Sequence, residues 1–170
     1  MKQRKFLTLV LIGILLGFGM TALLRSRQVR VVWLLVTKHC PRCDLREAQL
    51  FGANLENANL QSADLTLANL SEATLKGANL AQARLQQANL SLANLAAANL
   101  TQALLERASL HGSTLMGAQL KNANLTQAEL LFADLETANL EGANLTQSNL
   151  QGANLAGANL NKTLMPFSKN

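Results

Sequence analysis

Aromatic residues and charges are both scarce in this chain, and their scarcity restricts the interior and the surface it can build. Only 4% of the 170 residues are aromatic and there is no Tyr, although 49% are hydrophobic. Because the apolar residues are almost all Leu and Ala, the interior must consist of small, repeated units. Charged residues make up 15%, so the surface must be mostly uncharged polar. The length allows one ordinary domain and no more.

Acidic residues are missing from the first 42 positions, which contain eight Lys or Arg. The remaining positions carry seven basic and ten acidic residues. The net charge of +5 therefore reflects a basic N-terminal segment and not a nucleic-acid-binding domain. Basic residues beside a hydrophobic stretch suit anionic lipid headgroups.

The stretch Phe6–Leu24 has no charge over 19 residues, close to the about 20 that a helix needs to cross a bilayer. It predicts a transmembrane helix within residues 1–27, with membrane lipid as its partner. The alternative is a cleaved signal peptide, with an apolar region of about 7–15 residues, which would release an exported, soluble protein. The length of this stretch, and the lack of a convincing cleavage site before Arg25, favour the anchor. Basic residues flank both ends nearly equally, and the free amino terminus favours an exported repeat domain.

A five-residue repeat fills most of the chain. Leu occupies every fifth position from Leu45 to Leu160, which makes 24 consecutive leucines. From position 48 onwards, the residue two before each Leu is Ala, with Ser113 and Ser148 as exceptions, and the residue between is usually Asn. Gly recurs at one of the two remaining positions.

This period excludes the ordinary elements. On an α-helix, successive leucines would step around by about 140° and form no stripe. On a flat strand, an odd period places them on opposite faces. A chain that turns a corner within every five residues buries them all, because Ala and Leu two apart point the same way in an extended segment. We therefore expect a coil with a leucine core that includes Leu45, Leu65, Leu85 and Leu125, and with Gly at the corners.

The pattern Ala-(Asn/Asp)-Leu-X-X closely resembles the pentapeptide-repeat family. The resemblance covers residues 44–160 and implies an all-β fold, a right-handed quadrilateral parallel β-helix with four pentapeptides per coil. It implies about six coils for the 24 repeats. The segment Leu34–Leu45 also resembles a leader that precedes such repeats in many cyanobacterial proteins, which suggests a bacterial plasma or thylakoid membrane.

Residues 28–43 are expected to form an amphipathic cap before the repeats. Val29, Val32, Trp33 and Val36 follow the spacing of a helical stripe. An open β-helix end exposes leucines and unpaired strand edges, so we expect this stripe to cover the first coil. A helix lying on the lipid is the alternative. Residues 161–170 are expected to form a C-terminal cap or tail.

Cys40 and Cys43 form a Cys-Pro-Arg-Cys motif that allows several interpretations. Cys40 falls where a repeat leucine would stand, and Cys43 falls at the small inward site before Leu45. Free Cys packs as a small hydrophobe, so we expect both in the core. A disulfide is an alternative, and so is a metal or redox site. Zinc would need two more ligands, with only His39 near in sequence.

No catalytic, cofactor-binding or metal-binding constellation is visible, and we expect no enzyme, no cofactor and no small-molecule substrate. His111 falls at an outward corner, where we expect it to be solvated. Mimicry of DNA, which some members of the family use against topoisomerases, requires dense acidic charge, and the repeats carry little.

Four apolar residues instead stand at outward corner positions, all at one corner if a coil has 20 residues: Phe51, Leu92, Leu131 and Phe132. Exposed apolar patches often mark contacts, although single exposed leucines are normal. The sequence thus predicts a non-enzymatic, membrane-anchored scaffold with a protein partner contacting these four residues.

Overall fold

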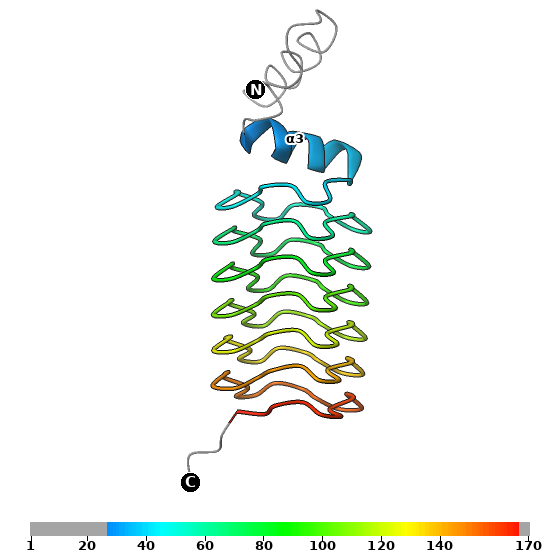
Figure 1. Cartoon of the computed structure of the whole chain (residues 1–170), viewed down its shortest axis with the longest axis vertical. Coiled ribbons are helices and arrows are strands. Elements are labelled where there is room, and N and C mark those ends of the chain that lie inside the picture. Colours follow the sequence, from blue (N-terminus) through cyan, green and yellow to red (C-terminus); the bar gives the residue numbers. More distant parts are fainter. Residues whose placement is uncertain (1–26, 167–170) are drawn as a thin grey trace, which may run out of the picture.

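The computed structural model describes residues 27–166, which form one helix and a stack of coils. Figure 1 shows the helix, α3 (Arg27–Thr37), lying across the end of the rod where the coils begin. The predicted transmembrane segment Phe6–Leu24 lies outside the described residues. Within 27–166, no helix is both long and apolar enough to cross a membrane.

The coils are held in register by parallel bridges that each join a residue to the one 20 positions later. The series runs from His39–Asn59 to Asn144–Leu164 without a break. Four pentapeptides therefore make one coil, which confirms the expected β-helix. Each side of the coil is so short that a single residue forms its bridge. The regular coils extend beyond the expected limits of 44 and 160 at both ends.

Every backbone amide of a typical pentapeptide has an acceptor, as residues 63–67 show. The amides of residues 64, 65 and 67 donate to carbonyls of the two neighbouring coils, at 2.7–3.0 Å. The amide of residue 63 donates to the carbonyl three residues earlier, closing the corner. The amide of residue 66 donates to the carboxylate of Asp64 at 3.1 Å. Asn or Asp recurs at this outward position because its side-chain oxygen accepts the one amide that the coils leave unpaired.

The corners are four-residue turns with a left-handed third residue. Every position from Arg42 to Lys162 that ends in 2 or 7 has a φ of 54–71°, whereas the residue before it does not have a positive φ. This combination matches type II turns. Glycine recurs here because it adopts positive φ without steric cost.

The core is a stack of buried leucines with alanines beside them. Leu45, Leu65, Leu85 and Leu125 are all fully or almost fully buried, as are the leucines between them. The inward position two residues before each Leu from Leu50 to Leu160 holds only Ala or Ser.

The two inward serines differ in their hydrogen bonding. Ser113 Oγ donates to the carbonyl of Leu110 at 2.8 Å, whereas Ser148 Oγ is buried and has no partner within the described part of the chain. A buried unpaired hydroxyl costs about 1–3 kcal/mol. We expect Ser148→Ala to raise the free energy of unfolding by about 1 kcal/mol, and Ser113→Ala to leave it nearly unchanged. Urea titrations of the two variants check this difference, and a loss of stability in Ser148→Ala would contradict it.

The helix α3 covers the first coil, but not with the expected stripe. Leu34 is fully buried in the core, and Val31 packs against it. Of the expected stripe, Val29 is buried, whereas Val36 is 65% exposed and Trp33 is 47% exposed. Val36 lies two residues from Leu34 and so points about 160° away from it on a helix. The prediction that the whole stripe faces the coil was therefore wrong, because Leu34, outside the stripe, makes the core contact.

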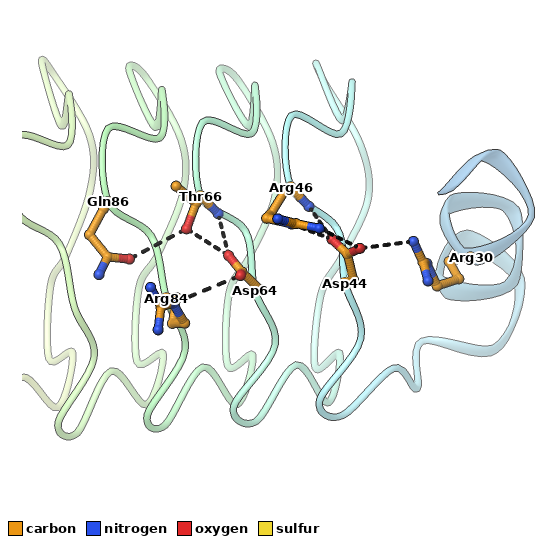
Figure 2. A network of polar contacts seen from close by, with 7 residues as sticks. All are labelled: Arg30, Asp44, Arg46, Asp64, Thr66, Arg84 and Gln86. Atoms are coloured by element: carbon orange, nitrogen blue, oxygen red, sulfur yellow. Dashed lines mark hydrogen bonds and ion pairs between the residues drawn. The ribbon is translucent and has the colours of Figure 1, made fainter. Parts of the chain in front are cut away.

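A network of charges ties α3 to the first coils, as Figure 2 shows. Arg30 of α3 contacts the carboxylate of Asp44 at 3.2 Å, and Arg46 contacts the same carboxylate at 2.9 Å. One coil further, Arg84 lies 3.8 Å from Asp64. The hydrogen bond from Arg46 lowers the pKa of Asp44 from 3.8 to about 2, with a smaller contribution from Arg30.

This network predicts an acid-sensitive contribution of Asp44 to the stability of the rod, mainly through Arg46. Because the pKa of Asp44 is lower in the folded state, its stabilising effect is complete above about pH 4 and is lost as the pH falls towards 2. We expect the thermal midpoint of the unchanged protein to fall over this range more than that of Asp44→Asn. Circular dichroism melts between pH 5 and pH 2 measure the difference. Parallel curves for the two proteins would contradict it.

The two cysteines are joined by a disulfide, which was an alternative to packing as free thiols. Their Cα atoms are 5.4 Å apart, and the bond closes the corner Cys40-Pro41-Arg42-Cys43. The amide of Cys43 also donates to the carbonyl of Cys40 at 3.4 Å. Cys40 is buried and Cys43 is half-buried against the core. The disulfide therefore fastens the first corner after α3.

Candidate functional site

The apolar residues expected at one outward corner do share one corner of the coil. Each coil takes 20 residues, so the corner that holds Leu92 holds Leu131 and Phe132 two coils later. Leu92 is 59% exposed, Phe132 is 62% exposed and Leu131 is half-buried. His111 occupies the coil between them and is exposed. We name Leu92, His111, Leu131 and Phe132 the apolar corner.

Two of these side chains stand on backbone that does not favour them. Leu92 has a φ of 59° and Phe132 a φ of 54°. The left-handed conformation costs an L-residue about 1–2 kcal/mol, and Gly or Asn avoids most of this cost. Neither side chain is well buried in return. Many other corner positions also carry side chains at positive φ, Leu67 among them, so the exposure and stacking of Leu92 and Phe132, rather than their backbone alone, point to a role outside folding.

Glycines make room for these side chains in the following coil. A Cβ added to Gly112 would lie 2.9 Å from Leu92 Cδ2, and one added to Gly152 would lie 2.4 Å from Phe132 Cδ1. Leu92 therefore lies over Gly112, and Phe132 lies over Gly152. From Leu92 onwards, large residue and glycine alternate along the corner, so each large side chain rests on bare backbone.

His111 contacts Phe132 directly. Their ring centroids are 5.9 Å apart and the rings are nearly perpendicular, at 86°. Such edge-to-face contacts stabilise by about 0.5–1.5 kcal/mol. The contact fixes the orientation of the Phe132 ring and adds a polar edge to the surface. No sequence pattern indicated it, because His111 was expected to be only a solvated corner residue.

Phe51 stands apart from the apolar corner. It is 61% exposed and lies at the same corner, but Ser71 and Glu72 occupy the coil between it and Leu92. Leu67 and Met116 are also exposed, and each lies at a different corner. The structure therefore brings together three of the four predicted contact residues.

Acidic residues border the apolar corner on both sides. Glu129 precedes Leu131 by two residues and Asp134 follows Phe132 by two, at the outward positions of the adjoining sides. Asp134 accepts hydrogen bonds from the Glu136 amide and from Asn154, each at 3.1 Å. The surface is thus apolar with a negative border. Residues 27–166 contain no group of three or more His, Cys, Asp or Glu that could hold a metal ion.

Comparison with known proteins finds the family described as pentapeptide repeats. Eight copies match, over residues 43–82, 68–107, 93–130, 103–142 and 128–165. These ranges together cover well over half of the chain. No curated protein matches the sequence.

Several solved structures are similar. HetL, a pentapeptide repeat protein involved in heterocyst differentiation regulation from the cyanobacterium Nostoc, is 32% identical, with 75% of this chain and 76% of HetL covered and a TM-score of 0.44. Rfr23, a pentapeptide repeat protein from the cyanobacterium Cyanothece, is 27% identical, with coverages of 82% and 99% and a TM-score of 0.56. QnrB1, a plasmid-mediated fluoroquinolone resistance protein, is 16% identical, with coverages of 74% and 68% and a TM-score of 0.40.

Proposed function

Since this chain belongs to the pentapeptide-repeat family, we propose that it is a non-enzymatic interaction protein whose apolar corner binds a protein partner. The observation that carries the proposal is the placement of Leu92 and Phe132. They are exposed, they occupy backbone that favours Gly or Asn, and glycines in the next coil make room for them. Selection for stability alone does not explain this combination.

The chemistry of the apolar corner indicates what kind of partner surface it can bind. Leucine and phenylalanine side chains offer apolar area, and clustered exposed apolar residues mark contacts more often than scattered ones do. The border of Glu129 and Asp134 disfavours an acidic partner, because like charges brought together at an interface cost several kcal/mol. The repeats also carry too little acid to imitate a nucleic acid. A protein surface with apolar residues and without acidic ones fits best.

The proposal includes a membrane anchor formed by Phe6–Leu24. The support comes from the sequence, since 19 residues without charge suit a single bilayer crossing. The anchor would place the rod at a bacterial plasma or thylakoid membrane, on the exported side. An exported, soluble protein released by signal cleavage is the second candidate, supported by the same apolar stretch.

Partner recovery from detergent-solubilised membranes tests the corner. We expect the tagged, full-length protein to recover a partner, and Leu92→Ser, Leu131→Ser and Phe132→Ser together to abolish the recovery. The matched control combines Leu67→Ser and Met116→Ser, which remove exposed apolar side chains from other corners. Equal recovery of the partner by the corner variant and by the control would contradict the proposal.

Alkaline extraction of membranes and N-terminal sequencing test the anchor. We expect the unchanged protein to stay in the membrane pellet, and a variant with Leu11→Lys and Leu15→Lys to be released. A mature protein whose sequence begins after Leu24 would reject the anchor and favour the exported form. The corner test does not depend on this outcome.

A further inference from the structure

The face of α3 that points away from the coils is apolar and is only partly covered. Val36, Trp33 and Leu35 are 65%, 47% and 37% exposed. Leu34 and Val31, on the other side, make the contact with the core. The helix therefore has two apolar faces, and the first coil accounts for only one of them.

An additional contact is expected from the composition of α3 alone. Seven of its eleven residues are apolar, and they surround the helix axis. A helix that is apolar all round is normally buried on all sides. Because α3 lies across the end of the rod (Figure 1), its outer face looks along the rod axis, away from the coils.

The chain before α3 indicates what lies opposite this face. Phe6–Leu24 ends three residues before Arg27, where α3 begins. Three residues span at most about 11 Å when fully extended, and each headgroup layer is about 5–8 Å thick. If Phe6–Leu24 crosses the bilayer, α3 must start within or next to the headgroup layer.

We propose that the outer face of α3, formed by Val32, Trp33, Leu35 and Val36, lies in the headgroup layer of an anionic lipid bilayer. The inference rests on the proposed anchor and adds to it a second lipid contact. Trp is enriched at the membrane–water interface, and Trp33 is the only Trp of the chain. On the α3 side of Leu24, residues 25–43 contain five basic residues and no acid, which complements anionic headgroups.

This contact gives α3 a double role. Its inner face closes the first coil, and Arg30 and Asp44 fasten it there. Its outer face holds the same helix against the lipid. The rod would then stand on the membrane by its N-terminal end, and its later coils would lie away from the bilayer.

Fluorescence of the single Trp tests the inference in the full-length protein. The protein is reconstituted in vesicles of phosphatidylcholine and phosphatidylglycerol, with and without bromine on the acyl carbons nearest the headgroup. We expect brominated lipid to quench Trp33 about twofold or more, and aqueous acrylamide to quench it little, as for other interfacial Trp residues. Val36→Asp should weaken the lipid quenching, whereas Met116→Asp, at an exposed site of the rod outside the apolar corner, should not change it.

Flotation of the same vesicles separates the possible outcomes. If the protein does not float, the anchor fails and the inference fails with it. If the protein floats but acrylamide quenches Trp33 freely, the inference is overturned and the anchor stands. Protection of Trp33 from both quenchers would mean that protein covers this face, which also overturns the inference.

Discussion

We expect Leu85→Ala to lower the free energy of unfolding by about 3 kcal/mol, within the range of about 2–5 measured for buried Leu→Ala changes. Leu85 is fully buried in the middle of the stack, with coils on both sides. The coils cannot close the cavity, because hydrogen bonds to both neighbours fix the spacing of the backbone. Each coil of a solenoid is stabilised by contacts with its two neighbours. Removing the Leu85 side chain therefore weakens the packing of its coil against both neighbouring coils. Urea unfolding of the full-length protein in detergent measures it.

Leu160→Ala is the matched control, with the same chemical change at the same repeat position. Leu160 is 37% exposed at the end of the rod, so truncation removes less buried area and leaves no closed cavity. We expect a loss of about 1 kcal/mol or less. Equal losses in the two variants would mean that burial in the stack does not determine the stability of the rod.

The leucine period was sufficient to predict the fold, because few backbones bury every fifth residue on one side. It did not give the number of pentapeptides per coil, which depends on how much the chain turns at each corner. That number came from the resemblance to the family, and the 20-residue spacing of the bridges confirms it. The reason for Asn at the outward position was also missed. The Asn side chain accepts the one backbone amide of each pentapeptide that has no backbone partner, and only the complete hydrogen-bond pattern shows which amide this is.

The helix α3 shows why a periodic pattern can give the right element and the wrong face. Its apolar residues surround the axis, so a stripe through Val32 and Val36 and a contact through Leu34 are both compatible with the sequence. The structure has Leu34 in the core and Val36 exposed. The choice depends on which apolar residue fits the open end of the first coil, where Leu34 enters the core, and that fit is not visible as a local pattern.

The apolar corner could be predicted only in part for a similar reason. Leu92, Leu131 and Phe132 break the polar rule of the corners, so the sequence alone identified them. His111 follows that rule, and its contact with Phe132 depends on the stacking of coils. The glycines under Leu92 and Phe132 are also found only when residues 20 apart are brought together.

Replacing both Leu92 and Phe132 by Asn separates a binding role from a structural one. Asn already occupies the equivalent turn position at two other corners, at Asn57 and Asn122, each with a φ of 55°. The substituted backbone therefore has a precedent within the same rod. Relief of the left-handed strain offsets the weaker packing against the glycines and His111 of the neighbouring coils. We expect the free energy of unfolding to stay within about 1 kcal/mol of that of the unchanged protein.

The affinity for the recovered partner should behave in the opposite way. Central apolar and aromatic contacts typically cost about 2 kcal/mol or more when truncated, which corresponds to a loss of about 30-fold or more in affinity. Titration of the purified partner measures this, beside urea unfolding of the same samples. A stability loss as large as that of Leu85→Ala, with binding retained, would assign the two residues to the fold. If binding is lost and stability is not, Leu92 and Phe132 serve the partner and not the fold. The strained backbone at both positions is then kept for binding, because the rod is as stable with Asn there.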